Sequence, residues 1–151
     1  LHTNDAPSAI ARLVDIGVEP FLITATLQAV VAQRLVRRIC RSCRVEFEPS
    51  DELVRELGLS RESLGGARFA RGKGCDECNF TGFRGRMALS EIMRVDERLR
   101  QAVLDGESTG ELIRVAQEGG MQSLRQAGLR AIFSGETTVE EVLRETIHEA
   151  V

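Results

Sequence analysis

The sequence predicts a mixed α/β chain in which two apolar segments flank a polar insert. Helical periodicity with capping residues occupies both ends of the 151 residues. From Cys40 to about Arg84 the composition turns polar and glycine-rich, and two Cys-x-x-Cys pairs bracket this stretch. No run approaches the roughly 20 apolar residues that a membrane-spanning helix needs. We therefore expect a soluble chain with one core and one small appended module.

Residues 1–39 predict two helices. Asp5 suits the N-cap of the first helix, apolar residues then recur on one face, and Gly17 ends it. The second helix is expected to start at Pro20 and to run through Leu35. Its residues are apolar almost all round, which indicates burial on more than one side.

Residues 40–84 predict a separate module with a sparse core. One short helix is expected over Asp51–Leu57, with Ser50 as its N-cap and Gly58 as its C-terminal stop. The large apolar residues are few for a stretch of 45 residues. They are Phe47, Leu53, Leu57, Leu59, Leu64, Phe69 and Phe80. Something other than apolar packing must therefore hold the module together.

Residues 85–151 predict a strand followed by a small helical bundle. The strand is expected over Arg86–Val95, and Asp96 can cap the helix after it. Two later positions have the spacing of a capping box. They are Ser108 with Glu111 and Thr138 with Glu141. Glycines at positions 119, 120 and 135 separate the helices.

The two Cys-x-x-Cys pairs, Cys40/Cys43 and Cys75/Cys78, predict a structural zinc site. Zinc prefers four thiolates in a tetrahedron, and a two-residue spacer lets both cysteines of a pair reach one ion. The pairs are separated by 31 residues and account for all four cysteines of the sequence. Four thiolates leave no position for water at the metal ion. Bound zinc would supply the folding energy that the sparse core lacks. A redox pair and disulfides are the alternatives, and a reducing compartment disfavours structural disulfides.

Glycines flank the second cysteine pair on both sides. They would supply tight turns in which backbone amides point at sulfur. They are Gly72, Gly74, Gly82 and Gly85. We therefore expect the turns themselves to support the thiolates.

Basic residues cluster around the two cysteine pairs. They suggest an alternative function, a zinc-ribbon module that binds nucleic acid and carries a helical tail. They are Arg37, Arg38, Arg41, Arg44, Arg68, Arg71, Lys73, Arg84 and Arg86. Interleaved acidic residues, the net charge of −3 and the lack of Trp and Tyr argue against this alternative. Nucleic-acid binding with a steep salt dependence would distinguish it. An ion-paired, solvated face is the simpler interpretation.

No phosphate-binding loop is expected in this sequence. A Walker A loop reads Gly-x-x-x-x-Gly-Lys-Ser/Thr. The one Gly-Lys pair, Gly72-Lys73, is followed by Gly74 and has Ala67 where the first glycine belongs. From the residues alone, His2 and His148 are most simply structural or exposed, and no Ser/His/Asp set stands out.

Several segments together resemble one known family, the hexameric ATPases that power type II secretion and type IV pilus assembly. Leu1-His2-Thr3-Asn4 is similar to the family's histidine box, and residues 12–21 are similar to the stretch that follows it. Residues 32–40 resemble the entry to its four-cysteine module, and residues 74–86 with 91–92 resemble the exit. Residues 120–129 and 135–138 resemble its helical C-terminal subdomain. The resemblance spans nearly the whole chain.

The resemblance implies a fold and a function. Residues 1–39 would be the end of a RecA-like ATPase core, 40–84 a four-cysteine zinc-binding subdomain, and 85–151 a strand with a C-terminal α-helical subdomain. His2 would act in catalysis by sensing the terminal phosphate of the nucleotide. The family's Walker motifs lie upstream of the histidine box. We therefore expect this chain alone to be inactive, and ATP with Mg²⁺ to bind only to the full-length parent, an ATP hydrolase.

The resemblance also implies partners and a location. The parent would be a homo-hexamer that drives an inner-membrane platform protein. It would be cytoplasmic and peripheral to the bacterial inner membrane, without a transmembrane segment and without nucleic acid as a ligand. The metal module is common to the secretion and pilus branches, so the sequence does not distinguish them.

Overall fold

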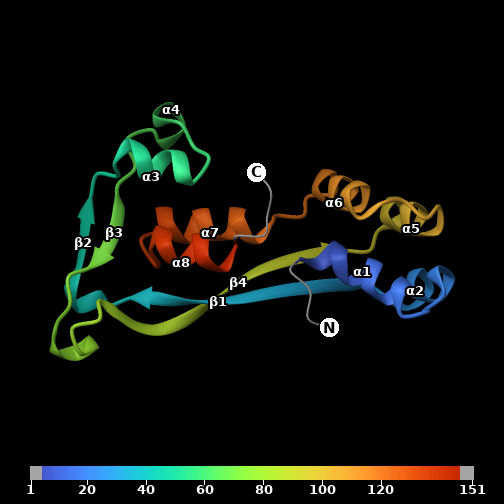
Figure 1. The fold of residues 1–151 in the computed structure, drawn as a ribbon, viewed down its shortest axis with the longest axis horizontal. Helices are drawn as coiled ribbons and strands as arrows, with labels where there is room; N and C mark the ends of the chain where they lie inside the picture. Colours follow the sequence, from blue (N-terminus) through green and yellow to red (C-terminus); the bar gives the residue numbers. More distant parts are fainter. Residues whose placement is uncertain (1–4, 147–151) are drawn as a thin grey trace. The chain divides into compact units, whose positions relative to one another are not determined.

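The computed structural model describes residues 5–146, whose contacts divide into two compact units (Figure 1). Within the described residues, unit 1 comprises 5–33 and 90–124, and unit 2 comprises 34–89 and 125–146. Helices and strands both occur, which confirms the predicted mixed α/β class. His2 and His148 lie outside the described residues. In the part described, no helix is long and apolar enough to cross a membrane.

Helices and strands alternate irregularly along the chain, and two strands contribute residues to both units. In chain order the elements are α1 (Ala6–Asp15), α2 (Pro20–Thr26), β1 (Ala29–Ile39), η1 (Arg41–Cys43), β2 (Arg44–Phe47), α3 (Asp51–Glu56), α4 (Arg61–Leu64), β3 (Phe69–Gly72), η2 (Asp76–Cys78), β4 (Phe83–Arg94), α5 (Glu97–Leu104), α6 (Thr109–Glu118), α7 (Leu124–Phe133) and α8 (Val139–Glu145). The η elements are single turns of 3₁₀ helix. Each carries part of one cysteine pair.

The predicted N-caps of the unit 1 helices are confirmed. The Asp5 carboxylate accepts a hydrogen bond from the Ser8 amide at 2.7 Å, and the Asp96 carboxylate accepts one from the Leu99 amide at 2.9 Å. The Ser108 hydroxyl accepts one from the Glu111 amide, but the Glu111 carboxylate accepts from Arg114, so only the N-cap half of the predicted capping box forms among the described residues. Each cap satisfies an amide that the first helical turn leaves without a partner.

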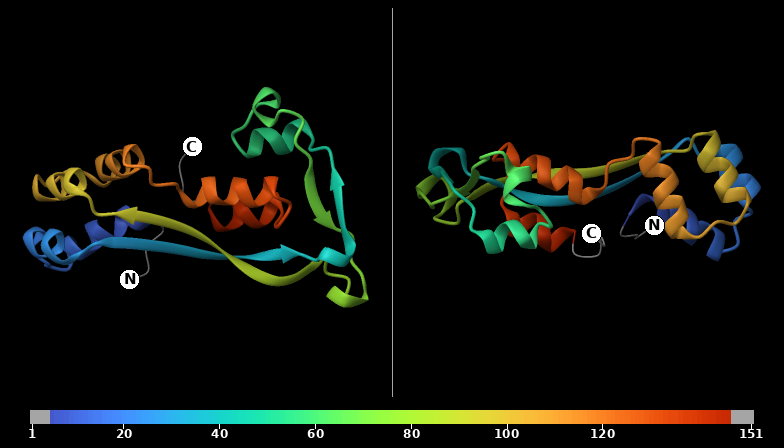
Figure 2. Two further views of the ribbon diagram at one scale, coloured as in Figure 1. Left: turned by 180° about the vertical axis from the view of Figure 1, so that it is seen from behind. Right: turned by 90° about the horizontal axis from the view of Figure 1, so that it is seen from above.

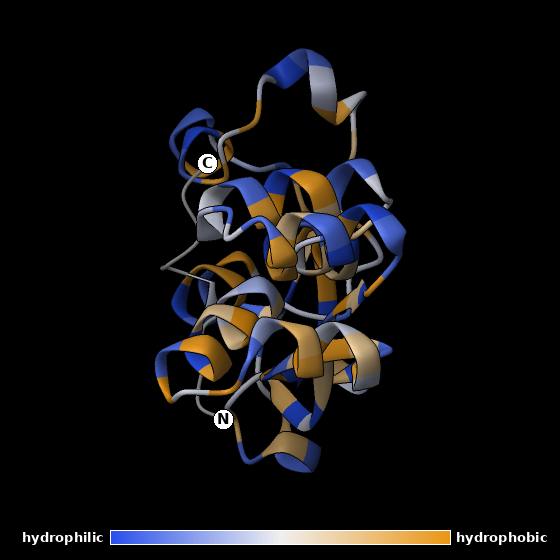
Figure 3. Ribbon diagram, turned by 90° about the vertical axis from the view of Figure 1, so that its right-hand side faces the viewer, coloured by the Kyte–Doolittle hydropathy of each residue, from blue (hydrophilic) through white to orange (hydrophobic). Residues whose placement is uncertain are grey.

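Unit 1 has its own apolar core. Helices α1 and α2 pack against α6 and α5, and hydrophobic (orange) and hydrophilic (blue) residues both occur along the helical ribbons (Figure 3). The core comprises Ala6, Ile10, Ile23, Met93, Val95, Leu99, Ala102, Val103, Leu112, Val115, Ala116 and Met121. Complete burial of one Leu or Ile side chain contributes about 1.5–3 kcal/mol, so this core can hold unit 1 together.

The predicted helix over Pro20–Leu35 is wrong beyond Thr26, because Ala29–Ile39 forms strand β1. β1 pairs with β4 in a two-stranded sheet, and the two strands run in opposite directions (Figure 1). The pairing continues past the start of β1, where the Val95 amide donates to the Gln28 carbonyl at 3.0 Å. Val30 and Ala32 pack on the unit 1 core, whereas Val31 between them is 59% exposed. This alternation has the period of a strand. The predicted strand over Arg86–Val95 is confirmed up to Arg94, where β4 ends.

Unit 2 contains an antiparallel hairpin that the sequence did not predict. β2 pairs with β3 in a register that places Arg44 opposite Gly72 and Phe47 opposite Phe69, and the two strands lie side by side in the left view of Figure 2. Each strand has only four residues, too few for an alternating pattern to stand out. The predicted α3, with its Ser50 cap, is confirmed between them.

The Phe69 ring lies at the centre of the packing in unit 2. Its ring centroid is 6.4 Å from that of Phe47 and 5.9 Å from that of Phe133 in α7, both in edge-on geometry. Helix α7 in turn packs closely on α8, since a Cβ placed on Gly128 would overlap the side chain of Val142. Helix α7 therefore packs against strand β3 of the hairpin, and α8 packs on α7.

The predicted capping box at Thr138 and Glu141 is wrong. Thr138 is the N-cap of α8, but its side chain makes no capping hydrogen bond within the described residues. The Glu141 carboxylate instead accepts a hydrogen bond from the Arg37 amide of β1 at 2.9 Å. In a capping box that carboxylate would accept a hydrogen bond from the backbone amide of Thr138. Here it binds β1 instead.

Candidate metal centre

The two cysteine pairs lie on two similar turns. Cys40 directly follows β1, and η1 then carries the chain to Cys43. Cys75 precedes η2, which ends at Cys78. Asn79 and Phe80 continue the second turn in the left-handed region, with φ of 48° and 59°. The chain can therefore reverse sharply enough to present both sulfurs of the second pair to the first.

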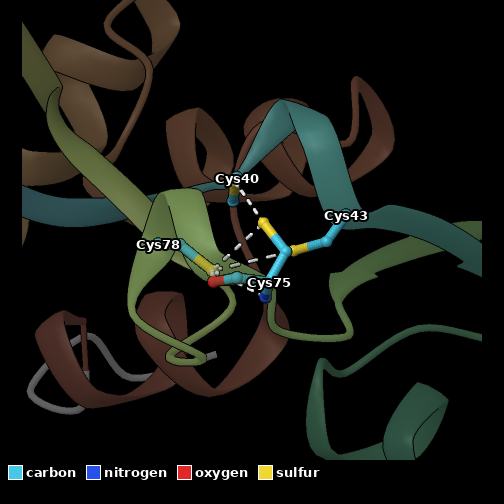
Figure 4. Close-up of side chains that lie close together, drawn as sticks. All are labelled: Cys40, Cys43, Cys75 and Cys78. Carbon is cyan, nitrogen blue, oxygen red and sulfur yellow. Dashed lines mark hydrogen bonds between the residues drawn. The ribbon is translucent and has the colours of Figure 1, made fainter.

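The structure brings all four predicted cysteines together, with their side chains converging from the two turns (Figure 4). The Sγ–Sγ distance is 3.9 Å for Cys40–Cys75 and for Cys43–Cys78, and 3.8 Å for Cys75–Cys78. All four sulfurs lie within 4.8 Å of one another, and all are free thiols. A tetrahedron with Zn–S bonds of about 2.3 Å has edges of roughly 3.8 Å. The cluster therefore has the size and donor set that a metal ion such as zinc requires.

Backbone hydrogen bonds tie the two turns to each other. The Cys40 amide donates to the Gly82 carbonyl at 2.9 Å, and the Lys73 amide donates to the Cys43 carbonyl at 3.0 Å. Gly82, with a φ of +77°, crosses close to the backbone of Gly72. The sulfurs are therefore held near one another by the protein chain as well as by any bound ion.

Backbone amides also point at the sulfurs, as the flanking glycines predict. The Gly74 amide donates to Cys43 Sγ, and the Gly82 and Cys75 amides donate to Cys78 Sγ, each at 3.3 Å. Such outer contacts orient metal ligands and stabilise their charge. The prediction is thus confirmed for Gly74 and Gly82, whereas the Cys75 amide was not anticipated from the sequence.

The same contacts separate the acidities of the thiols. Burial raises the pKa of Cys78, but the amides of Cys75 and Gly82 outweigh this effect and lower it to about 6. At Cys75, burial dominates and raises the pKa to about 11, and it also raises the pKa of Cys43. A divalent cation among the sulfurs would favour the thiolate form of all four.

Several of the neighbouring arginines are engaged in ion pairs. Their partners are acidic residues of the same unit. The pairs are Arg37–Glu141 at 2.7 Å, Arg38–Glu136 at 2.9 Å, Arg44–Glu46 at 3.5 Å and Arg84–Glu77 at 2.7 Å. An open depression of about 500 Å³ beside the first cysteine pair is lined in part by Arg38, Arg41 and Arg84. These pairs fit the interpretation of a solvated, charge-balanced face.

Comparison with known proteins gives one family and a consistent group of relatives. A family model described as type II/IV secretion system protein matches residues 1–144. The type IV pilus assembly ATPase PilB of Thermus thermophilus is 49% identical over 147 residues, which cover 97% of this chain and 16% of that protein. The same-named protein of Myxococcus xanthus is 43% identical over 147 residues (97% and 26%). The type II secretion system protein HxcR of Pseudomonas aeruginosa is 44% identical over 146 residues (97% and 27%). The chain thus spans about a quarter or less of the length of these relatives.

Proposed function

The chain belongs to the type II/IV secretion system protein family, and we propose that it is the C-terminal part of a hexameric ATPase that powers type II protein secretion or type IV pilus assembly. The family match over residues 1–144 carries this proposal. Relatives named for pilus assembly and for secretion are similarly close, at 49% and 44% identity. The proposal therefore covers both branches.

Three segments have separate roles in this proposal. Residues 1–39 end a RecA-like ATPase core, residues 40–84 form a zinc-binding subdomain, and residues 85–151 form a strand with a C-terminal helical subdomain. His2 senses the terminal phosphate of ATP in the full-length hexamer. ATP and Mg²⁺ bind to parts of the parent that precede this chain, and the chain alone does not hydrolyse ATP.

The role we propose for the four cysteines is to hold a structural zinc ion. Their sulfurs lie at separations close to the edge of a zinc–thiolate tetrahedron. Thiolate ligands favour zinc and other soft metals over magnesium or calcium. Four protein ligands exclude a water molecule, so the ion stabilises the fold and takes no part in hydrolysis.

In this proposal the zinc module is where the motor acts on its partner. The partner is an inner-membrane platform protein, and the parent works at the cytoplasmic face of that membrane. A module tied by a metal ion transmits force without deforming. Nucleic acid is not a ligand in this scheme, in keeping with the ion pairs that engage Arg37, Arg38, Arg44 and Arg84.

Elemental analysis tests the metal site directly. The chain, purified without chelators, is expected to contain about one zinc ion per molecule, because one set of four cysteines is present. Cys75→Ser should lower this content, because it removes one ligand. Wild-type protein with no zinc, or with another metal in its place, would contradict the proposal.

The role of the whole protein is tested in the full-length parent. His2→Ala is expected to reduce ATP hydrolysis strongly, because it removes the proposed phosphate sensor. Cys75→Ser should abolish secretion or pilus assembly, since it disrupts the module that meets the platform protein, while ATP binding remains intact. Steady-state hydrolysis and a secretion or piliation assay provide the measurements. If neither substitution has an effect on its own readout, the proposed roles are wrong.

A further inference from the structure

The segment that links α7 to α8 runs along β1 just before the first metal-binding turn. The Ile39 amide donates to the Glu136 carbonyl at 2.9 Å, and the Thr137 hydroxyl donates to the Arg37 carbonyl at 2.8 Å. The Arg37 amide donates to the Glu141 carboxylate at 2.9 Å. Backbone groups of β1 on both sides of Arg38 are thus bound by the C-terminal segment. Cys40 is the next residue after this bonded stretch.

Glu141 makes several hydrogen bonds to Arg37 and is the buried member of this contact. Its side chain is 1% exposed, and Oε1 accepts hydrogen bonds from Nε and Nη2 of Arg37 at 3.0 and 2.7 Å. Arg144 contacts its other oxygen, Oε2, at 2.9 Å. A buried carboxylate is costly unless it is paired and hydrogen-bonded. The arrangement of β1 and α8 meets that requirement here.

Arg37 is held on its other side by an aromatic ring. Its guanidinium carbon lies 4.1 Å from the centroid of the Phe83 ring in β4, a favourable cation–π distance. Phe83 directly follows Gly82, whose amide donates to Cys78 Sγ and whose carbonyl accepts from the Cys40 amide. A change at Glu141 would therefore reach residues beside both cysteine pairs through Arg37.

Two further contacts join the C-terminal helices to the module. Phe133 of α7 packs edge-on against Phe69 of β3. The Arg44 guanidinium, one residue after Cys43, lies directly over Gly135, where a Cβ would overlap it. The helices α7 and α8 therefore support the module at several points.

We propose that Glu141 is a positioning residue for the metal centre, and that α7 and α8 strengthen zinc binding by fixing the end of β1 through Arg37. This inference rests on the proposed zinc site. The two events are linked thermodynamically: if α8 docking strengthens zinc binding, bound zinc strengthens the docking of α8 by the same factor. Outer contacts of metal sites typically change metal affinity by about 10–100-fold.

Zinc release from the whole 151-residue chain tests the proposal. The zinc-loaded protein is mixed with excess chelator, and the release rate is followed with a chromogenic zinc indicator. Glu141→Gln and Glu141→Ala are expected to release zinc about tenfold faster than wild type. Glu140→Gln is the matched control, because Glu140 is an exposed carboxylate on the same helix. It should release zinc at the wild-type rate.

A second measurement uses the wild-type protein and does not depend on variants that fold. Amide hydrogen exchange is compared with and without zinc under reducing conditions. Removal of zinc is expected to speed exchange in α8. If a Glu141 variant does not fold, Thr137→Val, which removes only the bond to the Arg37 carbonyl, replaces it and should show a smaller increase in release rate.

Two results would overturn the inference. One is release within twofold of wild type from folded Glu141 variants, or from Thr137→Val where it replaces them. The other is exchange in α8 that is unaffected by zinc. A wild-type chain that binds no zinc would refute the proposed metal site itself, and with it the premise of this inference.

Discussion

At the scale of single residues, Gly82 allows the two cysteine-bearing turns to approach each other closely. Gly82 has a φ of +77°, and a Cβ at this position would lie 2.7 Å from the Gly72 carbonyl oxygen. Gly85 has nearly the same φ, +79°, but no described atom lies within 4 Å of the position its Cβ would take. Gly82 and Gly85 therefore share the left-handed backbone conformation, but only Gly82 lacks space for a side chain.

This pair gives a matched test of the close approach. Gly85→Ala is expected to cost about 1–2 kcal/mol of unfolding free energy, which is the penalty for a left-handed residue with a side chain. Gly82→Ala should cost about 1–3 kcal/mol more, because the two turns must also move apart. Urea denaturation of the zinc-loaded variants measures the difference. Equal losses at the two positions would show that the contact between the turns is unimportant.

The residue scale also shows what a sequence can and cannot reveal. The four cysteines are identified by their spacing, because each pair must reach one ion locally. The buried position of Glu141 has no such local signal. Its partner Arg37 lies 104 residues away, and the capping-box spacing with Thr138 suggested a different contact. Only the packing of α8 against β1 reveals its role.

At the scale of secondary structure elements, the α7–α8 pair depends on a small residue at its contact. Gly128 lies in the middle of α7, and its Cα faces the fully buried Val142 of α8. Glycine normally weakens a helix by about 1 kcal/mol relative to alanine. Here it permits the close approach, because no larger residue fits against Val142.

Substitution of Gly128 by alanine should destabilise the protein, although alanine has the higher helix propensity. Gly128→Ala is expected to lower the unfolding free energy by on the order of 1 kcal/mol or more, since overpacking outweighs the gain in propensity. The control is Gly110→Ala in α6, where the nearest described atom is 3.9 Å from the added Cβ. This substitution should be neutral or stabilise by up to roughly 1 kcal/mol. A stabilising Gly128→Ala, measured by thermal denaturation, would contradict the packing argument.

The strands were harder to predict than the helices for a physical reason. Helices such as α1, α5 and α6 carry their own signals, since caps and apolar periodicity are local. β1 follows the apolar α2 without a break in composition, so its Val and Ala residues extend a helical pattern. Its identity as a strand depends on β4, more than 40 residues later in the sequence. Pairing with this distant segment decides whether residues 29–39 form a strand or a helix.

At the scale of the whole molecule, the two units have different sources of stability. Unit 1 has a continuous apolar core formed by its own helices and strand ends. In unit 2 the hairpin and the cysteine turns have few large apolar residues, apart from Phe69 and its aromatic neighbours. A structural zinc ion contributes about 10–16 kcal/mol of apparent binding energy, so the hairpin and the cysteine turns should depend on metal far more than unit 1.

Removal of zinc under reducing conditions should therefore affect the two units unequally. Helices α1, α2, α5 and α6 are expected to keep their protection from hydrogen exchange, because their core contains no metal ligand. Strands β2 and β3 should lose theirs, since the two turns that anchor them separate. Peptide-level exchange with mass spectrometry measures both. Full retention of protection in β2 and β3 would mean that the module does not need its metal.

The base of the hairpin has a consequence for how this part of the protein can vary. Phe47 and Phe69 are paired across the hairpin, so the two ends of the segment between them are held at a fixed distance. Once both ends of a loop are fixed, doubling its length costs only about 0.6 kcal/mol in chain entropy. The region that carries α3 and α4 can therefore be shortened, extended or exchanged while the distances between the sulfurs are unchanged. Such a segment can differ in size among related proteins, and the cysteine turns can stay the same.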